Sequence, residues 1–516
     1  SHEKRVLGPV NFKRVHALKC KMSSKSNKRK LACKTEISVD PICHVAASTC
    51  LYRENNCFWD CLLNQTNIQN NNNKFYIIQL LKDKSKEKYY VWMRWGRVGL
   101  NGQNKLHEFL SNAQAAKDCF QAKFYDKTRN DWCKLKQFKK VAGKYDLVKN
   151  YFCDDGVKSN RIKLEDAPLD IKSTLDPKLQ ELILLISSFE EMTATAQEMN
   201  FDVTQMPLGK LTKVQINKGF AALKKIDSLI SRNIVGKELT EATNSYYTKI
   251  PHCFGMKTPP VIRSTAQLMS EIKLLELLGG IEIALTLFKS KLTVTKCHPI
   301  DQKYLSLKCK INLLAKESPT FQVIEKALLT THGRTHNLYT LAIEEMFQYE
   351  GNCQFKDEGN IIYLWHGSRL TNIASILGQG LRIAPPEAPV TGYMFGKGIY
   401  FADVSSKSAN YCYPTKNKDS GILLLCQVSL GDVNQLEEAD YEAGKLPPNK
   451  HSVLGLGKII PSGHLILPDG SKVMCGPNIE PVERDNLTLM YNEYVVYNTM
   501  QVAIKYLLKV KFNYLK

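Results

Sequence analysis

The spacing of apolar residues changes twice along this chain, and this limits the folds available to it. Between residues 174 and 297 apolar side chains recur every three or four positions, as they do on one face of an α-helix. Before and after this stretch they form short runs rich in valine, isoleucine and aromatic residues, which is typical of β-strands. At roughly 100–200 residues per domain, 516 residues correspond to three or four domains. We therefore expect a helical domain between two β-containing domains.

Residues 41–150 are predicted to form a small module built on an antiparallel hairpin. The strand-like segments KFYIIQLL and KYYVWMRWGRVGL are separated by the polar turn KDKSKEK. The later segment NAQAAKDCFQAKFYDKTRNDW has helical spacing, with Ala116, Phe120, Lys123 and Phe124 near one stripe. The expected fold is a small antiparallel sheet followed by one helix.

The stretch 174–297 carries signals for the starts of helices. Pro177 suits a first helical turn, and Thr212 precedes Gln215 by three residues, as in a capping box. The segment TAQLMSEIKLLELLGGIEIALTLFKS predicts a long helix that is interrupted at Gly279–Gly280. This stretch is expected to be an all-α bundle.

From about residue 306, segments such as GILLLCQVSLG, EYVVYN and YLLKVKFNYL predict strands of a largely antiparallel sheet. The whole chain is thus predicted to be a multidomain α+β protein. We expect a basic disordered tail (1–40), a small antiparallel-sheet module (41–150), a linker (151–173), an all-α bundle (174–297) and an α+β domain with an antiparallel β core (298–516).

Positive charge is concentrated at the front of the chain. Residues 1–150 contain 30 lysines and arginines against 12 aspartates and glutamates, whereas the other 366 residues contain 41 against 38. This segregation favours a module that binds a polyanion such as nucleic acid, and a solvated basic surface is the alternative. The run NKRK within the tail also resembles a nuclear address, so we expect a nuclear protein.

The sequence gives no sign of a membrane segment or a metal site. No stretch approaches the ~18 consecutive apolar residues of a membrane span, and the start lacks the apolar run of a secretory signal. The 16 cysteines lack the paired spacing of a disulfide framework, and the closest group (C-x6-C-x6-C-x3-C, residues 43–61) matches no standard zinc site. We expect reduced thiols, no metal and no membrane partner.

Three C-terminal stretches are candidates for chemistry: LWHGSR, GKGIYFADVSSKSANY and MYNEYVVYN. The glycines at 396–398 lack the spacing of a P-loop, and no strand–GxGxxG–helix unit surrounds them. The last stretch reads as one strand with a single carboxylate, Glu493, among tyrosines. That carboxylate either blunts a sheet edge or has a function. Together, one histidine, glycines, tyrosines, hydroxyls and a carboxylate could line a pocket for a planar ring and a ribose.

These motifs closely resemble the ADP-ribosyltransferase domain of the poly(ADP-ribose) polymerases, whose His-Tyr-Glu signature falls on His366, Tyr400 and Glu493. The segment VWMRWGRVG resembles the Trp-Gly-Arg (WGR) module of the DNA-damage-dependent members, and the helical stretch resembles their autoinhibitory regulatory domain. The resemblance covers roughly residues 41–516. It implies an enzyme that is activated by DNA breaks, consumes NAD+, builds poly(ADP-ribose) on proteins and releases nicotinamide.

The resemblance also implies a role for each site residue. Glu493 is expected to bind the 2′-hydroxyl of the nicotinamide ribose and to stabilise the cation that forms as nicotinamide leaves. It would also orient or deprotonate an acceptor hydroxyl, and a carboxylate suits both roles because it is anionic and only accepts hydrogen bonds. The residues expected to bind NAD+ are His366, Gly367, Ser368, Asn372, Arg382, Tyr400, Ser408 and Tyr411, and those expected on the acceptor side are Lys407 and Tyr491.

Within that set, the resemblance assigns the adenosine ribose to His366. It assigns the nicotinamide carboxamide to the Gly367 backbone and the Ser408 hydroxyl, and ring stacking to Tyr411. Tyr400 is expected to close the site. NAD+ is thus the expected substrate, and no metal is required because the leaving group is already a cationic pyridinium.

In the WGR module the resemblance places DNA contacts on Asn73, Lys74, Trp95, Arg97 and Tyr145. Arg97 and Lys74 suit a 5′-phosphate, and Trp95 suits stacking on an exposed terminal sugar or base. The alternative for Trp95 is a core tryptophan. We expect 5′-phosphorylated nicks and ends to be bound with little sequence preference.

Two positions bear on regulation. Glu276 matches an acidic position of the helical domain that faces the NAD+ pocket, whereas Gly280 stands where an aspartate is expected. Each glycine of Gly279–Gly280 weakens a helix by roughly 1 kcal/mol relative to alanine. The sequence therefore predicts a leaky autoinhibition.

The expected protein acceptors are histones and the enzyme itself. The chain stops at KFNYLK, without the Leu-Trp terminus that relatives use to bind the histone PARylation factor, so that partnership is in doubt. Two alternative functions stay open: a mono-ADP-ribosyltransferase of the same family, and a catalytically silent scaffold that binds DNA ends. Glu493 favours chain elongation, and the intact His-Tyr-Glu set argues against the silent scaffold.

Overall fold

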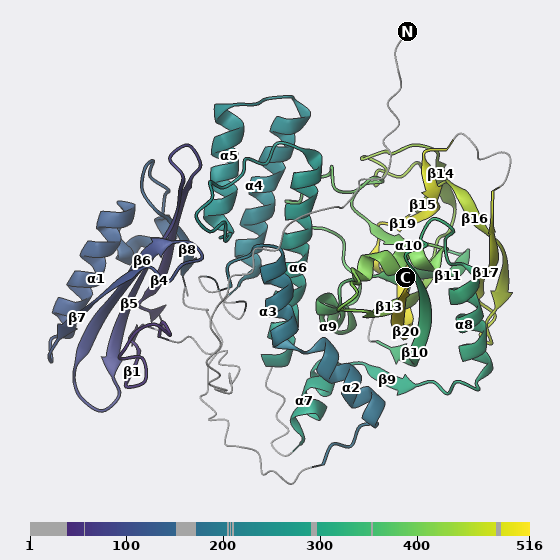
Figure 1. Ribbon diagram of the computed structural model, residues 1–516, viewed down its shortest axis with the longest axis horizontal. Helices are drawn as coiled ribbons and strands as arrows, with labels where there is room; N and C mark the ends of the chain where they lie inside the picture. The colour runs from purple at the N-terminus through teal and green to yellow at the C-terminus, as the bar shows by residue number, and fades with distance from the viewer. Residues whose placement is uncertain are drawn as a thin grey trace. The chain divides into compact units, whose positions relative to one another are not determined.

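The computed structural model describes most of the chain after residue 38 (Figure 1). The described residues are 39–55, 57–150, 172–203, 206, 208, 211–289, 297–351, 354–480 and 487–515. The expected tail (1–40) and linker (151–173) therefore lie almost entirely outside the described residues. Within the described part, no helix combines the length and the apolar character needed to cross a bilayer.

The N-terminal module contains a six-stranded antiparallel sheet in the order β7-β6-β5-β4-β8, with β1 paired to β5. The predicted hairpin is confirmed, because β5 and β6 pair with Lys82 opposite Tyr89. The elements are β1 (Thr49–Leu51), β2 (Arg53–Glu54), β3 (Cys57–Phe58), β4 (Asp60–Asn67), β5 (Asn72–Asp83), β6 (Tyr89–Arg97), β7 (Gln103–Phe109), α1 (Ala113–Thr128), the 3-10 helix η1 (Trp132–Gln137) and β8 (Asp146–Asn150).

Helix α1 lies along one face of this sheet (Figure 1). The Asn112 side chain caps it by accepting a hydrogen bond from the Ala115 backbone at 2.9 Å. Ala116, Phe120 and Phe124 are fully buried against the strands, which confirms the predicted stripe.

The chain before β1 covers the opposite face of the same sheet. Val39 and Asp40, at the end of the expected tail, are buried there. Asp40 Oδ2 accepts hydrogen bonds from Arg94 Nε at 2.5 Å and from Trp92 Nε1 at 3.1 Å. A buried ion pair of this kind fixes the segment in place, so the folded module includes the last two residues assigned to the tail.

The helical region forms the predicted all-α bundle, and α4, α5 and α6 lie side by side in Figure 1. Pro177 is the first residue of α2, and Thr212 caps α4 by accepting a hydrogen bond from the Gln215 backbone at 3.3 Å. Both predicted helix starts are confirmed. The helices are α2 (Pro177–Ile186), α3 (Phe189–Glu198), α4 (Lys213–Ser231), α5 (Lys237–Lys249), α6 (Thr265–Lys289) and α7 (Pro299–Ser306).

Helix α6 runs without a break, so the predicted interruption at Gly279–Gly280 is wrong. The apolar residues that flank the glycines, among them Leu278 and Ile281, are fully buried. Burying such side chains stabilises the helix by roughly 1.5–3 kcal/mol each, which exceeds the ~1 kcal/mol cost of each glycine.

The C-terminal region contains two sheets that are largely antiparallel, as predicted. One has eight strands in the order β18-β16-β17-β11-β13-β20-β10-β9, and the other has four in the order β12-β19-β15-β14. Helix α8 lies beside β17 (Figure 1). The elements are β9 (Lys310–Leu313), α8 (Pro319–Thr330), β10 (Tyr339–Glu350), β11 (Ile361–Gly367), α9 (Leu370–Gln379), β12 (Ile399–Phe401), α10 (Ser405–Ala409), η3 (Asn410–Cys412), β13 (Ser420–Ser429), β14 (Val433–Leu436), β15 (Ser452–Gly455), β16 (Gly457–Ile466), β17 (Lys472–Ile479), β18 (Leu489–Tyr491), β19 (Glu493–Val496), η5 (Thr499–Gln501) and β20 (Val502–Tyr514).

The segment MYNEYVVYN, predicted as one strand, forms two. Strand β18 pairs with β16 of the larger sheet, whereas β19 pairs with β12 and β15 of the smaller one. Asn492 lies between them, so the chain changes sheets at this residue. Gly457 permits the crossing, because a Cβ there would lie 2.2 Å from the carbonyl carbon of Tyr491. Glu493 is therefore the first residue of its strand.

Eleven of the described cysteines carry free thiols, and Cys57 forms a disulfide. The prediction of reduced thiols is therefore wrong for Cys57. Among the described residues, no group of three or more His, Cys, Asp or Glu side chains is placed to hold a metal ion.

Candidate active site

Strand β11 brings His366 to the candidate site. His366 Nδ1 lies 2.8 Å from the carbonyl oxygen of Tyr400. A carbonyl oxygen only accepts hydrogen bonds, so Nδ1 carries the proton and Nε2 of the neutral ring is an acceptor. Burial lowers the pKa of His366, which keeps the ring neutral near pH 7. His366 can therefore accept a hydrogen bond from a ligand hydroxyl.

Gly367, the next residue, lies directly against α10. A Cβ at Gly367 would lie 1.8 Å from the carbonyl oxygen of Ser408, so a side chain there would displace α10. Ser408 is buried, and its Oγ donates a hydrogen bond to the carbonyl oxygen of Trp365 at 2.8 Å. The fold thus brings together the two residues that were expected to hold a carboxamide.

Two tyrosines border this pair. The Tyr400 hydroxyl donates to the carbonyl oxygen of Gly396 at 2.7 Å and accepts from the Phe395 backbone at 3.0 Å. Burial raises the pKa of Tyr400 far above its usual value, so the phenol stays neutral. The Tyr411 side chain is 50% exposed, and its Cβ lies 3.5 Å from the Cβ position of Gly367. Tyr411 is therefore placed to stack on a planar ligand held beside Gly367.

Glu493 forms an ion pair with Lys407 of α10. Lys407 Nζ lies 3.0 Å from Glu493 Oε1, and each side chain is 16% exposed. The same ammonium group donates to the carbonyl oxygens of Tyr491 at 2.9 Å and Asn492 at 3.0 Å. Burial lowers the pKa of Lys407, although the Glu493 carboxylate opposes this. Lys407 thus ties the carboxylate to the backbone that carries it.

The position of Glu493 decides between the two interpretations of its charge. Strand β19 is an inner strand between β12 and β15, so Glu493 does not protect an open sheet edge. Its carboxylate acts electrostatically on the phenols of Tyr400 and Tyr411. Glu493 therefore faces the same site as the two tyrosines and carries a charge that edge protection does not explain.

The predicted adenosine side lies against α6. Asn372 Nδ2 donates to Ser368 Oγ at 3.1 Å, so these two predicted residues are in contact. Asn372 Oδ1 is buried with no hydrogen-bond partner among the described residues. It faces Gly280, because a Cβ there would lie 2.3 Å from this oxygen.

Acidic residues of α6 approach the same side. Arg382 interacts electrostatically with the carboxylates of Glu282 and Glu276. Glu276 Oε1 also accepts a hydrogen bond from the Tyr393 hydroxyl. The helical region thus touches the adenosine side through both polar groups and close packing.

Sequence reasoning missed a histidine beside the acceptor side. His336 Nδ1 lies 2.7 Å from Ser406 Oγ, and its ring centre lies 5.1 Å from that of Tyr491. Burial, with a smaller effect of His332 and Lys407, lowers the pKa of His336 to about 4. The pair of histidines in THGRTHN is a visible signal, but nothing in it points to Ser406, which lies 70 residues later.

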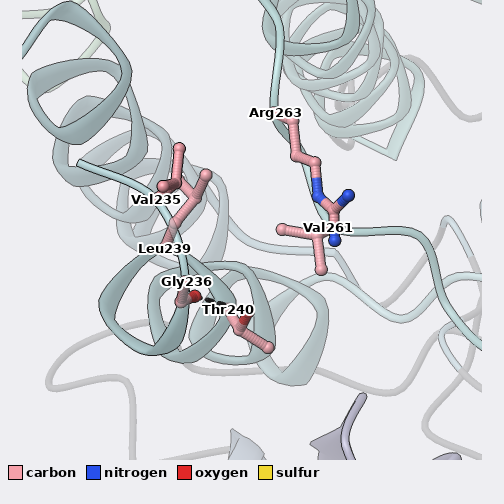
Figure 2. A pocket seen from close by; sticks show the side chains of 6 residues that line it. All are labelled: Val235, Gly236, Leu239, Thr240, Val261 and Arg263. Carbon is pink, nitrogen blue, oxygen red and sulfur yellow. Dashed lines mark hydrogen bonds between the residues drawn. The ribbon is translucent and has the colours of Figure 1, made fainter. Parts of the chain in front are cut away.

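Two cavities are lined by none of the predicted site residues. One, of about 280 Å³, lies at the start of α5 in the helical region (Figure 2). It is lined by Val235, Gly236, Leu239, Thr240, Val261 and Arg263. The other, of about 460 Å³, is formed by the ends of β10 and α9 and the start of β20.

In the N-terminal module, four of the side chains around the predicted DNA-binding positions form one aromatic and basic cluster. Trp95 stacks on Tyr76 with ring centres 5.4 Å apart and planes inclined by 10°. Lys74 Nζ lies 5.4 Å from the ring centre of Tyr145, which meets Tyr76 edge-on. Trp95 and Tyr145 are partly exposed, so Trp95 is not a fully buried core residue.

The other two predicted DNA-binding residues contact the helical region. Asn73 is buried, and its Nδ2 donates to the carbonyl oxygen of His252 at 2.9 Å. Arg97 donates to the carbonyl oxygens of Gly255 at 2.5 Å and Lys257 at 2.6 Å. Sequence reasoning did not anticipate these contacts, which join residues more than 150 positions apart.

His252 continues this connection to α6. It is buried, with Nδ1 2.7 Å from the carbonyl oxygen of Ile250 and Nε2 2.9 Å from Glu271 Oε2. Both partners only accept hydrogen bonds, so both ring nitrogens carry protons. Burial opposes this charge, but Glu271 and the Ile250 carbonyl outweigh it and raise the pKa of His252.

Comparison with known proteins assigns the chain to a family. Three family models match: the poly(ADP-ribose) polymerase catalytic domain at residues 318–512, the poly(ADP-ribose) polymerase regulatory domain at 173–304 and the WGR domain at 59–139. Poly [ADP-ribose] polymerase 2 of Homo sapiens is 46% identical over 497 residues, which cover 94% of this chain and 85% of the relative. The chain belongs to the poly(ADP-ribose) polymerase family.

Other polymerases of this family match different shares of their own length. Poly [ADP-ribose] polymerase 2 of Arabidopsis thaliana is 41% identical over 88% of this chain and 73% of the relative. Poly [ADP-ribose] polymerase 1 of Danio rerio is 39% identical over 95% of this chain but only 49% of the relative. In domain arrangement this polymerase therefore matches the type 2 relatives more completely.

The family ranges agree with the site geometry and differ from the predicted domain bounds at two points. All residues from His366 to Glu493 lie within the polymerase catalytic range. The regulatory range continues to residue 304 and so includes most of α7, which packs against α2 and α6. The WGR range ends at 139, whereas β8 (Asp146–Asn150) completes the sheet and Tyr145 belongs to the aromatic cluster.

Proposed function

We propose that this family member is an NAD+ ADP-ribosyltransferase that is switched on by broken DNA, builds poly(ADP-ribose) on proteins including itself, and releases nicotinamide. The observation that carries the proposal is the placement of Glu493 on an inner strand, paired with Lys407 and facing the same site as Tyr400. A carboxylate in this position can stabilise the positive charge that develops on a ribose when its glycosidic bond breaks.

For substrate binding, His366 Nε2 would accept a hydrogen bond from a hydroxyl of the adenosine ribose. The Gly367 backbone and the Ser408 hydroxyl would hold the nicotinamide carboxamide, and Tyr411 would stack on the ring. Asn372 and Arg382 would contact the adenosine side. These assignments come from the family resemblance, and the hydrogen-bonding capacity of the residues and the contacts among them support the proposal.

For the chemical step, the bond between ribose C1′ and the nicotinamide nitrogen would break, and its electron pair would leave with nicotinamide. Glu493 would stabilise the positive charge that develops on the sugar. An acceptor hydroxyl would then form the new C1′–O bond and pass its proton to Glu493, and such general-base assistance is typically worth ~10²–10⁴-fold. Lys407 would hold the carboxylate in place.

Autoinhibition would act on the adenosine side. Helix α6 approaches Asn372 through Gly280, Arg382 through Glu282, and Tyr393 through Glu276. While these contacts persist, α6 competes with NAD+ for the same residues. Loosening of the helical region would therefore raise the apparent affinity for NAD+.

Broken DNA would act through the N-terminal module. Lys74, Trp95 and Tyr145 offer a cation and aromatic faces for a terminal phosphate and base. Asn73 and Arg97 contact the segment 252–257, and His252 contacts Glu271 of α6. A ligand that engages Arg97 would compete with its bonds to Gly255 and Lys257.

The test is incubation of the purified protein with labelled NAD+, with and without a 5′-phosphorylated nicked duplex. We expect label to enter high-molecular-weight polymer on the protein, with free nicotinamide released, slowly without DNA and much faster when the nicked DNA is present. Modification that stops after one unit would identify a mono-ADP-ribosyltransferase. DNA binding without any nicotinamide release would identify a silent scaffold.

The same proposal extends to partners and location. We propose histones and the enzyme itself as acceptors, 5′-phosphorylated nicks and ends as the activating DNA, and the nucleus as the place of action. The basic front of the chain supports a polyanion partner. The histone PARylation factor is a further candidate partner, and a pull-down of that factor with this chain tests the interaction.

A further inference from the structure

A buried carboxylate, Asp403, lies close to β19, the strand that carries Glu493. Asp403 lies just after β12 and is 1% exposed. Its Oδ2 accepts hydrogen bonds from Asn492 Nδ2 at 2.7 Å and from the Tyr494 hydroxyl at 3.2 Å. Its Oδ1 is buried with no hydrogen-bond partner among the described residues. None of the functions assigned above uses this group.

The two partners of Asp403 are the neighbours of Glu493 in the chain. Side chains alternate along a strand, so residues 492 and 494 point to the face opposite Glu493. A single carboxylate that binds both neighbours fixes this alternation. It therefore determines which face Glu493 occupies.

The anchored position is also the point where the chain changes sheets. Strand β18 belongs to the larger sheet and β19 to the smaller one, with Asn492 between them. Asn492 Oδ1 also accepts a hydrogen bond from the Gly457 backbone at 2.9 Å. Such a junction is not held by a continuous ladder of backbone bonds, and side-chain bonds have to define it.

Asp403 also acts on the cation that binds Glu493. Lys407 interacts electrostatically with both Glu493 and Asp403, and its Nζ donates to the carbonyl oxygens of Tyr491 and Asn492. The Lys407 ammonium group is thus paired directly with Glu493 at 3.0 Å and is also attracted by the charge of Asp403. Asp403 therefore favours the charged form of the lysine that holds the catalytic carboxylate.

We propose that Asp403 is a positioning residue for Glu493: it anchors Asn492 and Tyr494 from the buried side and, with Lys407, holds the catalytic carboxylate toward the substrate. This inference rests on the role proposed for Glu493. It predicts that loss of Asp403 impairs the chemical step more than NAD+ binding, because His366, Gly367 and Ser408 lie on other elements. A misplacement of about 1 Å at a catalytic group can reduce rates by about 10²-fold.

The experiment measures kcat and KM for NAD+ in nicotinamide release on nicked DNA. Asp403→Ala, which removes the anchor, is expected to lower kcat about 10- to 100-fold with KM changed less than threefold. Asp469→Ala is the control, because Asp469 also accepts a hydrogen bond from a tyrosine hydroxyl (Tyr363, 2.7 Å) but lies in an exposed turn and contacts none of the predicted site residues by a described hydrogen bond. It is expected to retain the activity of the parent protein.

A conservative exchange separates positioning from general stability. Asp403→Asn keeps an acceptor for both partners but removes the charge, and Asn492→Asp places two carboxylates face to face. Each is expected to lower kcat. The double variant Asp403→Asn/Asn492→Asp restores one carboxylate and one amide in reversed order, and we expect it to recover at least half of the lost kcat on a logarithmic scale.

The dependence of kcat on pH distinguishes the proposed role from a purely structural one, which would leave this dependence unchanged. Lys407 faces three titratable groups, Glu493, Asp403 and His336. Burial lowers the pKa of Lys407, and the two carboxylates oppose this. Without the charge of Asp403 the pKa of Lys407 falls further, so the alkaline limb of kcat is expected to move to lower pH in Asp403→Asn and back in the double variant.

If Asp403→Asn and Asp403→Ala keep kcat within twofold, or if the double variant is no better than the single ones, the proposal is overturned. If Asp403→Ala does not fold, Tyr494→Phe decides, because it removes only one bond to Asp403, and an unchanged kcat again overturns the proposal. Glu493→Gln measured in parallel keeps the two claims apart. Full activity in that variant refutes the role of Glu493, whereas its loss together with an unaffected Asp403→Ala refutes only the anchor.

Discussion

The two ends of the candidate NAD+ site are held in different ways. At the proposed nicotinamide end, Gly367, Ser408 and Glu493 contact residues of the catalytic region. At the proposed adenosine end, Asn372 and Arg382 also approach groups on α6 of the regulatory region. In the proposed function the contacts of the reacting end thus lie within one region, whereas access to the other end depends on a second domain. Such a division allows regulation to change substrate access without disturbing the chemistry.

The largest expected effect is at the reacting end. Glu493→Gln keeps the size of the side chain but removes the charge that pairs with Lys407. We expect polymer elongation to fall by about 100-fold or more, equally with and without nicked DNA, as measured by product length and nicotinamide release. Glu442→Gln, which breaks an exposed ion pair with Lys445, is the control and is expected to change neither rate. Full elongation by Glu493→Gln would contradict the assigned role.

A second change at the same end tests the close packing of Gly367 against Ser408, which together form the cradle proposed for the nicotinamide carboxamide. Gly367→Ala places a Cβ 1.8 Å from the Ser408 carbonyl oxygen, so α10 has to move. We expect KM for NAD+ to rise about 10-fold or more, again independently of DNA. Gly463→Ala is the matched control, because its added Cβ meets nothing closer than 3.8 Å. Equal KM values for the two alanine variants would show that the cradle does not hold the substrate.

The adenosine end should respond in the opposite direction. Tyr393→Phe removes the hydrogen bond to Glu276 and so weakens the hold of α6 on the catalytic region. A bond to a partly exposed charged group is worth about 1 kcal/mol, so the DNA-free rate of automodification is expected to rise about fivefold, while the DNA-stimulated rate is unchanged. The control is Tyr363→Phe, which loses a similar bond to Asp469 far from α6. A DNA-free rate that does not rise would show that the hydrogen bond between Tyr393 and Glu276 does not contribute to autoinhibition.

These contrasts also indicate what a sequence can reveal. Helix caps and apolar stripes were predictable, because they involve residues that are close in the sequence. Thr212 caps the helix by binding a residue three positions later, and the buried residues around Phe120 recur every four positions. The grouping of His366 with Glu493 came from a family resemblance, since neither spacing nor composition relates residues on different sheets.

The features that sequence reasoning missed depend on contacts distant in the chain. At the break of the last predicted strand, Asn492 donates a hydrogen bond to Asp403, 89 residues earlier. Asn73 was expected to bind DNA, and the sequence did not reveal that its side chain donates a hydrogen bond to the carbonyl oxygen of His252, 179 residues later. Local propensity carries no information about such partners.

The smallest expected effect concerns the glycine pair in α6, of which only Gly280 faces the adenosine end. A Cβ at Gly279 would meet no atom within 4 Å, whereas a Cβ at Gly280 would lie 2.3 Å from Asn372 Oδ1. Gly279→Ala therefore only strengthens the helix, by about 1 kcal/mol, and is expected to lower the DNA-free rate of automodification by up to about fivefold. Gly280→Ala gains the same helix stability, but its Cβ crowds Asn372 and so loosens the packing of α6 against the catalytic region, and these two effects on autoinhibition oppose each other. We expect its DNA-free rate to stay within about twofold of the parent rate.

The pair of variants thus serves as its own control, because both add one methyl group to the same turn of α6. Measurement of DNA-free automodification alongside thermal unfolding separates a stiffer helix from a shifted site residue. If Gly279→Ala raises the unfolding temperature but leaves the DNA-free rate unchanged, the glycines do not make autoinhibition leaky, and the stability of α6 does not limit access to the adenosine end. If the rate falls as expected, the stability of α6 controls access to the adenosine end. The contacts at the reacting end do not involve this helix.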